Sequence, residues 1–193
     1  MLNGFRVLVT AVALVGTVGC ATGATSTAGA PAGTLMLTTP AFAAGEAIPL
    51  RFSAYGENVS PELNWSNLPA GTRSLALILD DPDAPTPEPF VHWVVYNIPA
   101  SATGLPEGLP TDARLATPAD VAGAIQGPTG LGRPGYFGPR PPAGPVHNYN
   151  FRLYALRSEP NLPEGLGPDD LRDAISDDIL GQATLVGTYQ ATQ

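Results

Sequence analysis

The chain has 193 residues and a formal charge of −8, from 17 acidic residues and nine basic ones, all of them arginine. This length suits one folded domain. An acidic chain without a basic run lacks the cations that replace counterions on nucleic acid or anionic lipid, which excludes a nucleic-acid-binding protein and a polybasic membrane patch. Glycine and proline contribute 22 residues each, yet 44% of the chain is hydrophobic, which favours a loop-rich, all-β globular domain over disorder.

The N-terminal 19 residues are typical of a secretory signal peptide. One arginine precedes an apolar run from Val7 to Val18, which is too short to span a bilayer as a permanent helix. The segment Thr17–Cys20 resembles a bacterial lipobox, in which the cysteine becomes the lipidated first residue of the mature protein. Cys20 is also the single cysteine of the chain, so an internal disulfide is excluded.

The expected organisation has three parts. Residues 1–19 form the signal peptide, residues 20–34 form the lipidated Cys20 with a flexible Ala/Gly/Thr/Ser tether, and residues 35–193 form the folded domain. This arrangement predicts a lipoprotein anchored to the membrane at the cell envelope through Cys20. The alternative is cleavage slightly later, within residues 21–30, which releases a soluble secreted or periplasmic protein.

Within the folded domain, short apolar runs alternate with clusters of Gly, Pro, Asn and Asp. This spacing predicts an all-β fold with minor α content, built as an antiparallel β-sandwich. The strands are expected in the segments Leu35–Thr38, Ile48–Ala54, Ser74–Asp80, Val91–Ile98, Asn148–Leu156 and Thr184–Tyr189.

One segment departs from the strand pattern. Apolar residues recur at helical spacing at Leu171, Ile175 and Ile179. Acidic residues precede them and Gly181 follows, so the pattern predicts an amphipathic helix from Pro168 to Leu180 that packs on the sheets. A further helical turn is expected at Pro118–Ala124. The Gly/Pro-rich run Gly127–Pro145 suits no regular element and is expected to form a long functional loop.

The chain has two histidines, and each lies at a predicted strand beside a turn-rich loop. Strand alternation places His92 on the face of Phe90, Val94 and Tyr96, with Trp93 and Val95 on the opposite face. The same rule groups His147 with Tyr149, Phe151 and Leu153. Carboxylates at residues 80–83 lie near enough in sequence to bond an imidazole. Each histidine taken alone is better explained as a core or rim residue with satisfied hydrogen bonds, but two histidines in the same kind of setting weaken that interpretation.

Four motifs follow one another along the domain: Asp81–Pro85, His92–Val95, Gly138–Gly144 and His147–Tyr149. In this order they resemble the motifs of the phosphatidylethanolamine-binding proteins, and more closely their bacterial Raf-kinase-inhibitor-like branch of YbhB/YbcL type. The resemblance runs from about Leu35 to Tyr189. It implies two antiparallel β-sheets with one or two short peripheral helices.

The resemblance also implies a small pocket for phosphate-like or carboxylate anions, such as a phospholipid head group. Carried over by motif, its lining residues are Asp81, His92, Gly138, Pro142, His147 and Tyr149. Imidazole donors, a tyrosine hydroxyl and a backbone N–H beside a glycine can converge on an anion. A carboxylate such as Asp81 orients a neighbouring imidazole and favours its charged form. Two residues have supporting roles: Pro141 stiffens the wall, and Asp83 is expected to cap loop backbone rather than contact the ligand.

The sequence departs from the family pattern next to this pocket. Where the family usually reads His-Arg-Tyr, this chain has Asn148 between His147 and Tyr149. Strand alternation turns Asn148 away from both neighbours, so the substitution removes a cation but keeps the pocket wall.

Four kinds of function remain open at this point. The leading interpretation is an envelope-anchored binding protein, without cofactor or metal, that takes an anion or a phospholipid head group. A second is an inhibitor or scaffold of a protein partner such as a kinase or protease. A third is an enzyme, with His92, His147 and a carboxylate acting as acid and base or as metal ligands. The fourth is a purely structural envelope protein. The usual nucleophile and zinc motifs are absent from the sequence.

Overall fold

The computed structural model describes residues 1, 4, 33–159 and 161–191. The predicted lipobox with Cys20 and almost all of the predicted tether lie outside these residues. Within the described part of the chain, no helix has the length and apolar character that crossing a membrane requires.

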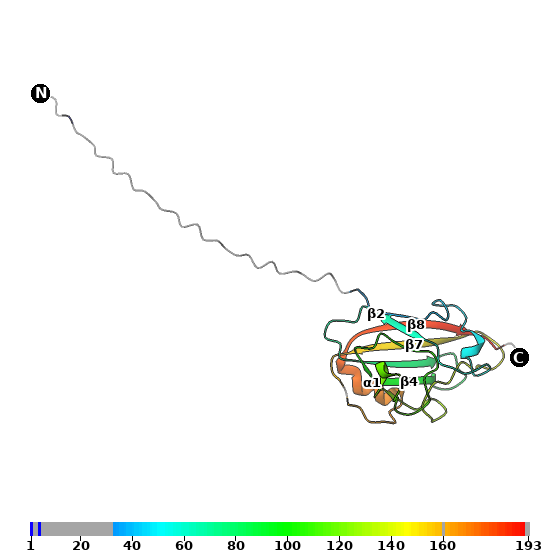
Figure 1. The fold of residues 1–193 in the computed structure, drawn as a ribbon. Helices are drawn as coiled ribbons and strands as arrows, with labels where there is room; N and C mark the ends of the chain where they lie inside the picture. Colours follow the sequence, from blue (N-terminus) through cyan, green and yellow to red (C-terminus); the bar gives the residue numbers. More distant parts are fainter. Residues whose placement is uncertain (2–3, 5–32, 160, 192–193) are drawn as a thin grey trace. The chain divides into compact units, whose positions relative to one another are not determined.

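Two antiparallel sheets make up the folded domain (Figure 1). The five-stranded sheet has the order β6 (Ile125–Gln126), β4 (Phe90–Pro99), β3 (Ser74–Asp81), β7 (His147–Leu156) and β8 (Ile179–Tyr189). The three-stranded sheet has the order β1 (Met36–Thr38), β2 (Leu63–Ser66) and β5 (Gly104–Leu105). The helical elements are η1 (Leu50–Phe52), η2 (Ala119–Val121), α1 (Pro168–Ile175) and η3 (Ser176–Asp178). The predicted fold class, a mostly antiparallel β structure with a short helix, is confirmed.

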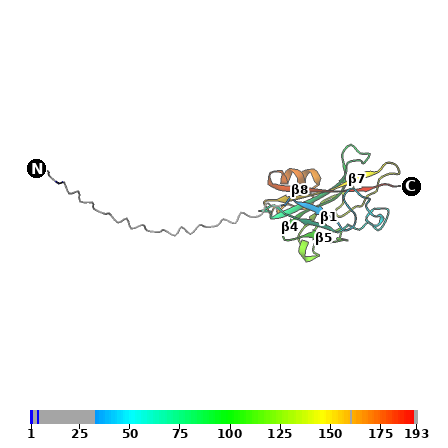
Figure 2. The same cartoon turned by 90° about the horizontal axis from the view of Figure 1, so that it is seen from above.

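Both faces of the five-stranded sheet are buried, each against a different partner. Alternation along β7 sends Tyr149, Phe151 and Leu153 to the inner core, which they share with buried residues of the three-stranded sheet. Tyr154 and Leu156 belong to the outer core, which α1 completes with its own buried side chains. Figure 2 shows α1 on one side of the sheet and β1 and β5 on the other.

The predicted helix from Pro168 to Leu180 is shorter in the structure. The α-helix ends at Ile175, and after one 3₁₀ turn the chain enters β8 at Ile179, which pairs with Leu156 and is 37% exposed. Gly181, expected just beyond the helix, lies inside β8 opposite Ala155. The strand pairing between β7 and β8 thus determines the conformation of Ile179, even though its sequence spacing suits a helix.

The expected strand Ile48–Ala54 is also absent, because its middle forms the 3₁₀ helix η1. Pro49 precedes η1, and its carbonyl accepts a hydrogen bond from the N–H of Phe52 (3.0 Å). Ile48 and Phe52 are buried while Leu50 is exposed. Two of the apolar side chains that suggested a strand are therefore buried around a 3₁₀ turn instead. The helical turn expected at Pro118–Ala124 is present as η2.

Candidate functional site

A β-bulge in β4 determines where His92 points. Leu79 pairs with Trp93 but the next residue, Asp80, pairs with Val91, so His92 is an extra residue without a partner in β3. The predicted alternation is therefore wrong for Val94 and Tyr96, although His92 does pack against Phe90 as predicted. The His92 ring packs edge-on against Tyr149 of the inner face, with 5.1 Å between ring centroids. It is separated from Val94 and Tyr96, which belong to the outer core.

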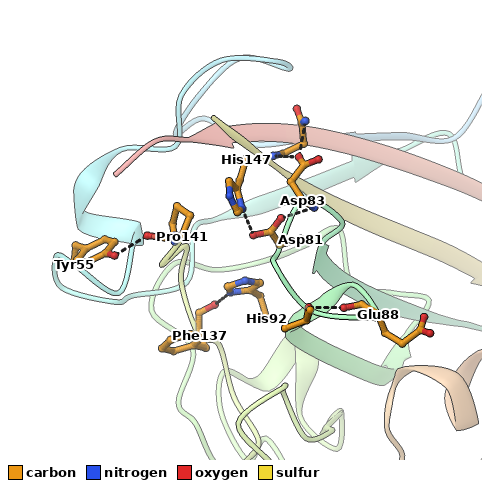
Figure 3. A network of polar contacts seen from close by, with 10 residues as sticks. Tyr55, Asp81, Asp83, Glu88, His92, Phe137, Pro141 and His147 are labelled. Carbon is orange, nitrogen blue, oxygen red and sulfur yellow. Dashed lines mark hydrogen bonds and ion pairs between the residues drawn. The ribbon is translucent and has the colours of Figure 1, made fainter. Parts of the chain in front are cut away.

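His92 is held between the aromatic rings of Phe90 and Phe137. Its ring stacks on that of Phe137 at 5.6 Å between centroids, and Phe90 approaches at 4.9 Å. His92 Nδ1 donates to the Phe137 carbonyl at 2.7 Å (Figure 3), while the Phe137 N–H donates back to the His92 carbonyl at 2.9 Å. Because a carbonyl only accepts, Nδ1 carries the proton. Burial lowers the pKa of His92, against opposing effects of the Phe137 carbonyl and the Asp81 charge, and so favours the neutral ring.

Asp81 and His147 form a buried pair at the ends of β3 and β7. His147 Nδ1 donates to Asp81 Oδ2 at 2.8 Å, and both side chains are less than 5% exposed. The other oxygen, Asp81 Oδ1, accepts the backbone N–H of Asp83 at 2.9 Å. Both carboxylate oxygens are thus engaged, and the carboxylate fixes the orientation of the His147 ring (Figure 3).

Tyr149 supplies an unbonded donor in the same cluster. Its side chain is fully buried, and its hydroxyl lies near the Asp81 carboxylate but makes no hydrogen bond of full geometry with any described residue. Burial, followed by the charge of Asp81, raises the pKa of Tyr149, so the hydroxyl keeps its proton. A buried hydroxyl without a partner costs free energy, and such groups are rare in folded proteins.

The loop predicted from Gly127 to Pro145 forms one wall of the site. Gly138 lies so close to η1 that an added Cβ would sit 2.1 Å from the Phe52 carbonyl oxygen. Its N–H donates to Asn58 Oδ1 at 2.8 Å, so the Gly138 N–H is already bonded within the loop wall. Pro141 is buried and its carbonyl accepts the Tyr55 hydroxyl at 2.7 Å, whereas Pro142 is exposed.

Asp83 stands outside the buried cluster and ties the loop after β3 to β7. Its Oδ2 accepts both the backbone N–H and the side-chain Nδ2 of Asn148, each at 2.8 Å. These two bonds hold the pKa of the Asp83 carboxyl below its ordinary value. Asn148 is exposed and points away from His147 and Tyr149, as alternation along β7 predicts.

Sequence reasoning missed several residues that shape the site: Phe137, Asn58 and Tyr55. Asn58 precedes a Ser-Pro pair in a turn-rich segment, and this was its one local signal. Within residues 33–159 and 161–191, no group of three or more His, Cys, Asp or Glu side chains is arranged to hold a metal ion. The largest cavity described, about 620 Å³, is lined by Ser74 and Pro99 at the opposite end of β3 and includes none of the predicted site residues.

Comparison with known proteins agrees with this arrangement of sheets. The family described as phosphatidylethanolamine-binding protein matches residues 38–190. The chain belongs to this family. A UPF0098 protein of Methanothermobacter thermautotrophicus is 45% identical over 154 residues, which cover 80% of this chain and 97% of the relative. LppC of Mycobacterium tuberculosis, which is named as a candidate lipoprotein, is 44% identical over 81% of this chain and 72% of its own length.

Solved structures of the phosphatidylethanolamine-binding protein family share the fold. The homologue CT736 of Chlamydia trachomatis has a TM-score of 0.73 and 34% identity over 82% of this chain and 98% of its own. YbcL of Escherichia coli, described as a member of the mammalian PEBP family, has a TM-score of 0.73 and 30% identity, covering 82% of this chain and 99% of its own.

Proposed function

We propose that this member of the phosphatidylethanolamine-binding protein family binds a small phosphate-like or carboxylate anion, such as the phosphate of a phospholipid head group, at the cluster of Asp81, His92, His147 and Tyr149. The observation that carries the proposal is the fully buried Tyr149 hydroxyl, which makes no hydrogen bond within the described chain. A hydroxyl in this state is stabilised by an acceptor, and an anionic oxygen is the strongest acceptor available to it.

The two imidazoles complete the proposed site. His147 is oriented by Asp81 at 2.8 Å, and His92 is fixed by the Phe137 carbonyl at 2.7 Å, so neither ring must reorganise when a ligand binds. Preorganised groups of this kind reduce the entropic cost of binding. Pro141 and Pro142 follow Gly138 and stiffen the loop that borders the rings. We assign the chain a binding role rather than a catalytic one.

An NMR titration of the full chain tests this function. Phosphate and then phosphorylethanolamine are added while the imidazole signals are followed; the chain has two histidines, and His92→Ala and His147→Ala assign them. Saturable shifts of both signals, lost in the variants, support the anion site. No shift at millimolar ligand overturns it. A protein partner that remains bound after both histidines are replaced would instead support the inhibitor or scaffold function.

We also propose that the chain is exported and anchored at the cell envelope through a lipid on Cys20. The lipobox-like segment ending at Cys20 supports this, as does the name of the relative LppC. Labelling of growing cells with radioactive palmitate tests it: the label should enter the protein and be lost in Cys20→Ser. Label that persists in Cys20→Ser, or an unlabelled soluble protein, contradicts the anchor.

A further inference from the structure

The charges around His92 limit which anions the site accepts. Asp81 and the more distant Asp80 both act on His92 with negative charge. While Asp81 is ionised, its pair with His147 carries no net positive charge in either protonation state of that imidazole. A doubly charged anion bound here would therefore lie beside a buried carboxylate without a compensating cation, which is costly in a buried environment.

Three arginines of neighbouring elements are engaged with other partners. Arg152 and Arg172 both pair with the Asp80 carboxylate. These two arginines approach Asp80 from the outer side of the sheet, away from Tyr149. The guanidinium of Arg140 lies over the Tyr55 ring, 5.9 Å from its centroid. Asn148, the residue between His147 and Tyr149, is a neutral amide bonded to Asp83.

The hydrogen-bonding groups of the site point to the same restriction. With its proton on Nδ1 and bonded to Phe137, a neutral His92 presents Nε2 as an acceptor, and Nε2 makes no hydrogen bond to the described residues. The Tyr149 hydroxyl is a donor without a partner. The two rings pack edge to face with 5.1 Å between their centroids, and we infer that one small ligand engages both groups. Such a ligand must donate one hydrogen bond and accept another.

We propose that the site binds phosphate monoesters as the singly protonated monoanion, in preference to the dianion and to phosphodiesters. This rests on the proposed anion-binding function and narrows it. The monoanion carries one P–OH group, which donates to His92 Nε2, and anionic oxygens, which accept from Tyr149. A phosphodiester has the same single charge but only acceptor oxygens. A dianion lacks the proton and adds a second negative charge next to Asp81.

Calorimetric titration of the full chain distinguishes these forms with two matched ligands. Phosphorylethanolamine is a monoester, and glycerophosphorylethanolamine is the diester found in an intact phospholipid head group. We expect the monoester to bind at least about tenfold more tightly at pH 6, and its affinity to fall about tenfold per pH unit above its second pKa of about 6. In that range, buffers of different ionisation enthalpy should report uptake of about one proton per ligand bound.

Three variants sharpen the test. Tyr149→Phe removes only an unbonded hydroxyl, so the fold should be kept while monoester affinity falls about tenfold or more. Tyr154→Phe, on the same strand but in the outer core, is the matched control and should bind normally. Asp81→Asn removes the buried charge, so affinity for the dianion should rise relative to the monoanion and the pH dependence should flatten.

The outcomes separate this inference from the proposed function. If neither ligand binds saturably at any pH, the anion-binding function itself fails. If monoester and diester bind equally, with affinity independent of pH, the site binds anions but the protonated-monoanion inference is overturned. Unchanged monoester affinity in Tyr149→Phe overturns it as well. A monoester preference that disappears above the second phosphate pKa supports it.

Discussion

Asp80→Asn probes the ionic cluster that joins β3, β7 and α1. The Asp80 carboxylate is 1% exposed and accepts hydrogen bonds from the guanidinium groups of Arg152 and Arg172, the latter at 3.3 Å, as well as from Asn150 at 3.3 Å. An asparagine of the same shape loses the charge and leaves two guanidinium groups around a neutral amide. Removal of one partner from a fully buried ion pair costs about 3–5 kcal/mol.

The two arginine side chains reduce this cost because they are 28% and 37% exposed and can turn toward water. We therefore expect Asp80→Asn to lower the free energy of unfolding by about 2–3 kcal/mol. For a domain of this size, each kcal/mol lowers the melting temperature by about 2–4 °C, so the expected decrease is about 4–12 °C.

Thermal unfolding followed by circular dichroism at neutral pH measures the effect. The control is Arg51→Gln, because Arg51 pairs with Glu107 at 2.8 Å on the surface with both side chains more than 40% exposed. That exposed pair should contribute less than about 1 kcal/mol. A melting temperature of Asp80→Asn as high as that of the control would refute the role assigned to the buried cluster.

Three further perturbations test other parts of the structure. Gly138→Ala should lower the free energy of unfolding by at least about 2 kcal/mol and weaken anion binding, because the added Cβ would lie 2.1 Å from the Phe52 carbonyl oxygen. Gly167→Ala is the control: it has open space around it, so denaturant unfolding should show a cost of no more than about 1 kcal/mol. Ile175→Ala should cost about 2–4 kcal/mol and the 37% exposed Ile179→Ala less than about 1 kcal/mol, whereas a helix that continued through Ile179 would bury both side chains and make the two costs similar. Because burial lowers the pKa of His92, the unfolded state binds more protons than the folded state below about pH 6.5. The free energy of unfolding should therefore fall as the pH drops through that value. In His92→Phe, unfolding measured over the same pH series should lack this dependence.

The long strands could be predicted from the sequence because their apolar runs are continuous or alternate cleanly. All eight residues of β3 are buried, and β7 sends alternate residues to the two cores. The short strands β2, β5 and β6, with two to four residues each, were not predicted. So few residues carry too little periodicity, and these strands are defined by their pairing partners rather than by their own pattern.

The site residues divide in the same way. His147 and Tyr149 lie on a regular strand, so alternation alone placed both on the inner face. His92 lies at a bulge, and a single extra residue reverses the expected face. The partners of His92 and Gly138 come from loops distant in sequence, namely Phe137 and Asn58. Tertiary contacts of this kind leave no local signal.

The asparagine at position 148 connects the geometry of the site with its charge. Both its backbone N–H and its side-chain amide donate to Asp83, so this bond ties the loop after β3 to β7 without an arginine. The position of Asp81 against His147 is thereby kept, but the electric field of a cation is not. Because the described neighbours of His147 include a neutral amide here and no free cation, this position adds no positive charge to the cluster. That charge balance is the reason for the proposed preference for a singly charged, protonated ligand.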